Sequence, residues 1–132
     1  MQTFIPYPNL LESAAVLDYR RLGKQRVEVI QILKAIKFNV GWTHHPATKM
    51  WKEYPNSLAY YGVIICDEWI KRRYLDSCRQ KIIDLYEPIW TEPHWWNSKI
   101  HLSHQSNLVR KFPEHYLKYF DVPNNLVYYW PI

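Results

Sequence analysis

Apolar residues recur at intervals of three and four along most of the chain, and prolines or polar clusters separate the recurring stretches. This spacing is typical of amphipathic helices that bury one face. It predicts helices over residues 9–18, 20–38, 47–53, 55–73, 76–86, 98–111 and 113–120. Asn9 and Ser98 suit helix caps, and Pro55 and Pro113 suit first turns. The sequence therefore predicts an all-α fold, a single compact helical bundle domain that covers residues 1–132.

Two of these helices carry the stripes that we expect to form the core. The stripes are Val27, Ile30 and Leu33 in the first long helix and Leu58, Tyr61, Ile65 and Trp69 in the second. Residues 87–97 contain two prolines and three tryptophans, which predicts an irregular connection. Cys66 and Cys78 lie within predicted helices, and we expect them to be buried free thiols.

The composition adds a surplus of positive charge and of aromatic rings to this picture. The chain has a net charge of +5, a pI of about 9.2, seven Trp and eleven Tyr. Cations beside flat rings suit a negatively charged partner with unstacked bases, although most of the rings are expected in the core. The sequence shows no signal peptide and no membrane-spanning run, so we expect a cytoplasmic protein with no membrane partner.

The most informative stretch is DYRRLGKQRVEVIQ, residues 18–31. It places four cations within seven residues, namely Arg20, Arg21, Lys24 and Arg26. In a helix, Lys24, Glu28 and Gln31 share a face, so one carboxylate lies within a cationic surface. The cations predict contacts with phosphates, which bind such surfaces through counterion release. Glu28 is open to two interpretations, an exposed ion pair with Lys24 or a functional acid.

Six histidines raise the question of a metal site. His101 and His104 stand three apart on a predicted helix, and His44 and His45 lie in a loop. Nothing resembles an HExxH motif and nearby carboxylates are few, so we expect no bound metal and no cofactor. The expected roles are hydrogen bonding and, for the loop pair, contact with a nucleic-acid backbone or an extruded nucleotide.

A second block, HLSHQSNLVRKFPEHYLKYF at residues 101–120, interleaves cations with rings and suits the gripping of a strand. Its candidate contacts are His101, His104, Arg110, Lys111, Tyr116, Lys118 and Tyr119. Trp51, Trp95 and Tyr119 are candidates for filling the stack that an extruded base leaves.

Three segments carry a resemblance to a known family. The pattern S-x-x-S-x-L-x-x-K-x-P-x-x-Y-x-K-Y-F at residues 103–120 resembles the end of the small pyrimidine-dimer DNA glycosylases of the phage endonuclease V type. Residues 50–74 are similar to their middle helix, and DYRRL stands where they carry an E-Y-R-E-L-like segment. The blocks at residues 17–28, 44–46 and 103–111 resemble, more closely, a bacterial and phage branch of unassigned function. The resemblance covers most of the chain and implies a DNA-repair enzyme.

The resemblance also implies a mechanism. In that family the amine of a threonine, exposed by methionine removal, attacks the sugar C1′ and forms a Schiff base that permits strand scission, and a glutamate assists. Here Gln2 follows Met1 and is too large for normal methionine removal, so the nucleophile would be the α-amine of Met1. Arg21 stands at the position of the family's glutamate. Glu28, two turns along the same face, would replace it as acid/base.

We therefore expect a monomeric DNA glycosylase with AP-lyase activity that acts on a damaged or modified base in double-stranded DNA. Met1 and Glu28 are the expected catalytic residues. Two alternatives stay open. One is a non-catalytic nucleic-acid-binding module on the same bundle, and the other is a hydrolase that uses the histidines with a metal.

Overall fold

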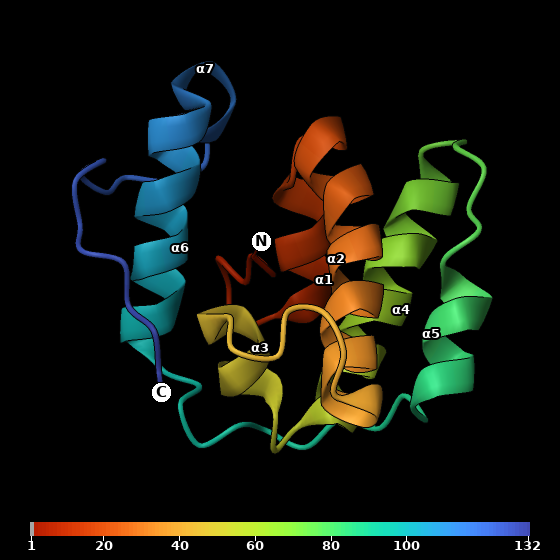
Figure 1. The fold of residues 1–132 in the computed structure, drawn as a ribbon. Helices are drawn as coiled ribbons and strands as arrows, with labels where there is room; N and C mark the ends of the chain where they lie inside the picture. The colour runs from red at the N-terminus through yellow and green to blue at the C-terminus, as the bar shows by residue number, and fades with distance from the viewer. Residues whose placement is uncertain (1) are drawn as a thin grey trace.

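The computed structural model describes residues 2–132, and within them the chain forms seven helices and no strand. The helices are α1 (Leu10–Val16), α2 (Tyr19–Phe38), α3 (Pro46–Trp51), α4 (Pro55–Lys71), α5 (Arg79–Leu85), α6 (Ser98–Lys111) and α7 (Pro113–Tyr116). The predicted all-α fold is confirmed. The helices surround a shared apolar core, with α6 and α7 on one side and α2, α4 and α5 on the other (Figure 1).

Helix ends follow the predicted capping residues in most places. Asn9 accepts a backbone hydrogen bond as the cap of α1, and Pro55 and Pro113 occupy the first turns of α4 and α7. The cap of α6 is Asn97, and Ser98 is the first helical residue. α5 starts later and α7 ends earlier than predicted, because residues 77–78 form a bend and residues 117–119 form a turn instead.

The core forms where α4 packs against α1, α2 and α5. Leu58, Tyr61 and Ile65 are fully buried, which confirms the predicted stripe of α4. Trp69, at the end of this stripe, is partly buried and packs against the core. Cys66 and Cys78 are buried and free, as predicted.

The buried face of α2 differs from the predicted one. Ile30 and Leu33 are buried, but the side chain of Val27 is 44% exposed, so the prediction for this residue is wrong. The reason is that α2 packs on two sides, against α4 and α5 and also against the N-terminal segment. Its buried arc is therefore broader and centres on Leu22, Val29 and Ile32, and Val27 lies outside this arc.

The N-terminal segment runs through the interior of the molecule, between α2 and α6 (Figure 1). Residues 2–6 are buried there. The C-terminal tail, residues 121–132, returns along α6, where the amide of Tyr129 donates to the hydroxyl of Ser103 at 2.9 Å. No helix of residues 2–132 has the length and apolar character needed to cross a bilayer.

Candidate active site

Side chains from several helices hold the N-terminal segment in place. Gln25 of α2 accepts a hydrogen bond from the amide of Phe4 at 2.8 Å. On the other side, Nδ1 of His104 accepts from the amide of Ile5 at 2.9 Å, and His101 contacts the carbonyl of Ile5 at 2.8 Å. Buried backbone groups need such partners, and here side chains supply them in place of a β-strand. The start of the chain is therefore held at a defined place in the fold.

A cavity of about 420 Å³ opens beside this segment. Its lining comes from the N-terminal segment, α2, the loop before α3, α6 and the tail, and consists of Gln2, Phe4, Arg20, Arg21, Lys24, Gln25, Glu28, His45, Asn107, Lys111, Tyr128 and Trp130. Four of these side chains are cations and one is a carboxylate. The cavity is therefore a positively charged recess with a single acid in its wall, and an anionic ligand suits it.

Glu28 is the acid in this wall, and its residue is only 6% exposed. One carboxylate oxygen lies 3.7 Å from Nζ of Lys24, so the ion pair expected from the sequence is present. The other oxygen accepts a hydrogen bond from the backbone amide of Gln2. A surface ion pair does not account for this second contact. Glu28 thus joins the cationic face of α2 to the beginning of the chain.

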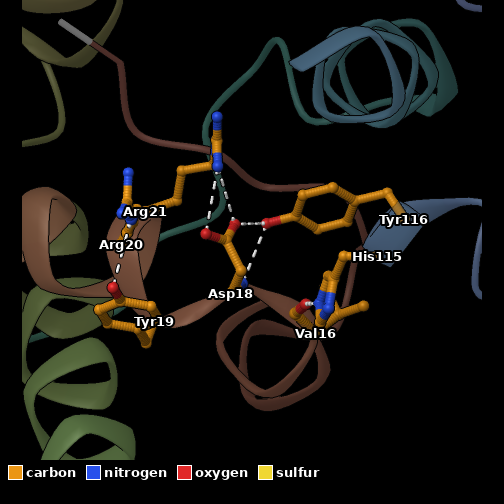
Figure 2. A network of polar contacts seen from close by, with 7 residues as sticks. All are labelled: Val16, Asp18, Tyr19, Arg20, Arg21, His115 and Tyr116. Carbon is orange, nitrogen blue, oxygen red and sulfur yellow. Dashed lines mark hydrogen bonds and ion pairs between the residues drawn. The ribbon is translucent and has the colours of Figure 1, made fainter. Parts of the chain in front are cut away.

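The guanidinium of Arg21 is held by a network at the start of α2 (Figure 2). Its Nη1 atom donates to both carboxylate oxygens of Asp18, at 3.1 and 3.3 Å. The hydroxyl of Tyr116 also donates to this carboxylate and accepts from the amide of Asp18. Arg20 lies beside this network, is exposed, and donates to the hydroxyl of Tyr19 at 3.2 Å. One arginine is therefore oriented in advance, whereas its neighbour is open to solvent.

His45 and the tail complete the cavity wall. Nδ1 of His45 accepts the amide of Ala47 at 3.0 Å, so the neutral ring carries its proton on Nε2. Burial lowers the pKa of His45, which favours this neutral form. The rings of Tyr128 and Trp130 stack at 4.8 Å, and Trp130 meets His45 edge-on. Burial raises the pKa of Tyr128 to about 12, so its hydroxyl stays protonated.

Six lining residues were not predicted from the sequence, namely Gln2, Phe4, Gln25, Asn107, Tyr128 and Trp130. The side-chain amide of Gln2 donates to the hydroxyl of Tyr128, and its carbonyl accepts from the amide of Thr3 at 2.7 Å. This contact brings together residues 126 positions apart. The run of aromatic residues at 128–130 was the only sequence signal for these lining residues.

Six predicted DNA contacts lie elsewhere, because their side chains are used in packing. Trp51, Trp95, His101, His104 and Tyr116 are at most 5% exposed. The indole nitrogen of Trp95 donates to the carbonyl of Met50, and that of Trp51 donates to the hydroxyl of Thr3. Arg26 points to the other side of α2, where it pairs with Asp76. None of the six lines the cavity, and we do not retain them as contacts.

The remaining predicted contacts are exposed and outside the cavity. They are His44, Arg110, Lys118 and Tyr119. Met1 lies outside the described residues. Among residues 2–132, no group of three or more His, Cys, Asp or Glu side chains comes together in a way that could hold a metal ion.

A cationic cavity with a buried acid in its wall, within an all-α fold, suits a polyanionic ligand. The family comparison identifies the class of protein. The model of the pyrimidine dimer DNA glycosylase family matches residues 1–81, which include α1 to α4 and all of the α2 residues that line this cavity, and the chain belongs to this family. No curated protein and no solved structure matches the chain. At the level of the family, it is a DNA-repair glycosylase whose substrate class is DNA.

Proposed function

We propose that the protein is a DNA glycosylase with AP-lyase activity in which the α-amine of Met1 is the nucleophile and Glu28 is the acid/base. The observation that supports this most is the hydrogen bond from the backbone amide of Gln2 to the Glu28 carboxylate. That amide belongs to the peptide bond that follows residue 1. The group that donates to the carboxylate is therefore the next backbone nitrogen along the chain from the amine that would react.

The chemistry needs an amine that is partly neutral and an acid that moves protons. An α-amine titrates near pH 8, so a fraction is neutral at physiological pH. In the proposed reaction its nitrogen attacks C1′, the bond from C1′ to the base breaks, and the base leaves with one of the two protons of the attacking amine. The C1′–O4′ bond then opens, giving an imine and a hydroxyl at C4′. Glu28 carries the second proton from the nitrogen to O4′. Loss of the C2′ proton and of the 3′ phosphate cuts the strand.

The cations around the cavity support its use on DNA. We propose that Arg20, Arg21, Lys24 and Lys111 bind phosphates, since none of them lies in the apolar core. His45 would contact the extruded nucleotide through its Nε2 proton, and His44 the backbone beside it. The cavity volume of about 420 Å³ lies within the range of small-ligand sites. Arg110, Lys118 and Tyr119 would contact the duplex further out.

Reductive trapping on abasic DNA tests the proposal. An amine forms an imine with the abasic sugar, and borohydride reduces this imine to a stable adduct. We expect a cross-linked band whose modified peptide contains residue 1, in wild type and in Lys24→Gln. An intact duplex of the same sequence serves as the substrate control and gives no adduct.

Two other outcomes separate the alternatives. Lys24 offers a second amine, with its Nζ atom 3.7 Å from a carboxylate oxygen of Glu28. An adduct that maps to this lysine would support lyase activity but would refute the α-amine of Met1 as the nucleophile. No adduct from a folded protein that binds the same duplex would refute the lyase and favour the non-catalytic binding module.

A further inference from the structure

A second cavity of about 440 Å³ adjoins the first one at the start of α2. It shares three lining residues with the first cavity, Arg20, Arg21 and Lys111. Its other walls are Asp18, Tyr19 and Phe112. The three shared cations therefore stand between the two recesses.

The charge that this second cavity presents is positive, although it contains an acid. The Asp18 residue is 6% exposed, and its carboxylate is occupied by Arg21 and by the hydroxyl of Tyr116 (Figure 2). Arg20 and Lys111 are exposed, and neither forms an ion pair with any of residues 2–132. Two positive charges thus stay available for a phosphodiester.

The cavity also offers flat rings. Tyr19 is 52% exposed and Phe112 is 37% exposed, and both border the cavity. The guanidinium of Arg21 lies 6.0 Å from the centre of the Phe112 ring, so a cation adjoins that ring. Rings next to cations bind single-stranded nucleic acid, because each base stacks while its phosphate is neutralised.

We propose that this second cavity is a subsite for the nucleotide that adjoins the processed one in the same DNA strand. Arg20 and Lys111 bind its phosphate, and its base stacks on Phe112 or Tyr19. Asp18 and Tyr116 are positioning residues that orient Arg21 between the two recesses (Figure 2). The identity of the strand rests on the proposed function. The subsite itself makes a separate claim about binding.

The test measures the affinity of short single-stranded oligonucleotides that carry a tetrahydrofuran abasic analogue, which cannot form an imine. Three forms are compared on each side of the analogue: no neighbouring nucleotide, a neighbouring baseless sugar phosphate, and a complete neighbouring nucleotide. Fluorescence anisotropy at low salt gives each dissociation constant. On one side only, we expect the base to tighten binding by roughly fivefold or more, the lower end of what stacking on a protein ring contributes.

Leucine substitutions assign this gain to the rings. Phe112→Leu and Tyr19→Leu keep an apolar side chain but remove the flat face, and the double variant should lose the gain from the base and keep the gain from the phosphate. Arg20→Gln should lose part of the phosphate gain. Phe38→Leu is the matched control, because Phe38 is 55% exposed at the other end of α2, about 28 Å from Tyr19, and should change neither gain.

The outcomes distinguish this subsite from the proposed function. Equal affinity for the baseless and the complete neighbour, or a full base gain in the folded double variant, would overturn the subsite, whatever the trapping experiment shows. A base gain on one side that the double variant loses supports the subsite even if no adduct forms on abasic DNA. In that case the proposed lyase activity is refuted and the proposed nucleotide subsite is retained.

Discussion

Arg20 and Arg26 lie six residues apart in the same basic stretch of α2, yet the structure gives them different environments. Arg20 is exposed at the border of the cavity, and its hydrogen bond goes to Tyr19. The Arg26 side chain is 13% exposed, pairs with Asp76, and places its guanidinium 4.4 Å from the centre of the Trp69 ring. Arg20 is free to bind an anionic ligand, whereas Arg26 is already paired with the carboxylate of Asp76. The number of cations in a sequence therefore overstates the number available to a ligand.

Helix geometry explains how these two environments arise so close together. Successive residues are about 100° apart, so Arg20 and Arg26 lie about 120° apart around α2, and Arg26 and Glu28 lie about 160° apart. Glu28 faces the N-terminal segment, and Arg26 faces α4 and the segment before α5. Burial opposes the charge on Asp76, but hydrogen bonds from the amide of Arg79 and from Arg26 hold the pKa of Asp76 below its ordinary value. The pair belongs to the folded structure rather than to the ligand surface.

Removing Arg26 should have the largest effect on stability. Arg26→Ala leaves the Asp76 carboxylate, whose side chain is 3% exposed, without its cation. Breaking such a pair costs about 3 kcal/mol or more of the free energy of unfolding. Urea denaturation measures the loss. Arg79→Ala is the control, because the Arg79–Asp67 pair is 43% and 55% exposed and should contribute less than about 1 kcal/mol. Equal losses of unfolding free energy in the two variants would show that the burial of the Arg26–Asp76 pair does not increase its contribution to stability.

Replacing Glu28 should have the largest effect on the reaction. Glu28→Gln keeps an oxygen that can accept from the amide of Gln2 but removes the acid. We expect the rate of strand cleavage on abasic DNA to fall by roughly a hundredfold or more, while DNA affinity stays equal or tightens because a negative charge is lost. Single-turnover cleavage and binding are measured on the same duplex. An unchanged rate in the folded variant would leave Glu28 as only a partner of Lys24.

The pH dependence of stability should reveal the core histidines. Burial lowers the pKa of His104 from 6.5 to about 3, since Nδ1 accepts from Ile5 and Nε2 has no partner among residues 2–132. Between pH 6.5 and 3, His104 is protonated in the unfolded state but stays neutral in the folded state. The free energy of unfolding should therefore fall as pH drops from 6.5 toward 3, by up to about 1.4 kcal/mol per pH unit.

Denaturation at pH 7, 6 and 5 measures this slope. His104→Gln retains an acceptor for the amide of Ile5 and should show a shallower slope, with the remainder due to His101, whose pKa burial also lowers. A slope that does not change in His104→Gln would contradict the assignment.

The sequence predicted the features that depend on near neighbours along the chain. The helical spacing, the cap at Asn9, the first-turn proline Pro55, and the pairing of Lys24 with Glu28 all involve residues within four positions of each other. Such contacts follow from helix geometry alone. The choice of Glu28 as the unusual residue of the basic face also came from this local pattern.

Contacts between distant residues could not be predicted in the same way. Arg26 and Asp76 are 50 positions apart, and Gln2 and Tyr128 are 126 apart. Periodicity shows that a helix has a buried face but not what covers each side of it, which is why Val27 was misplaced. Trp95 and His104 likewise have side chains suited to DNA contact, and packing decides that they serve the core.

The smallest expected effect separates the cavity border from the rest of the exposed surface of α2. Arg20→Gln removes one cation from the cavity border, and the slope of log affinity against log salt should become shallower by about 0.9 if Arg20 neutralises one phosphate of duplex DNA. Lys34→Gln is the matched control, since Lys34 is an exposed cation of the same helix that does not line the cavity. Both variants lose one unit of net charge, so a general charge effect would shift them alike. A shallower slope in Arg20→Gln alone would place a phosphate at the cavity border, and equal slopes would remove Arg20 from the contact surface.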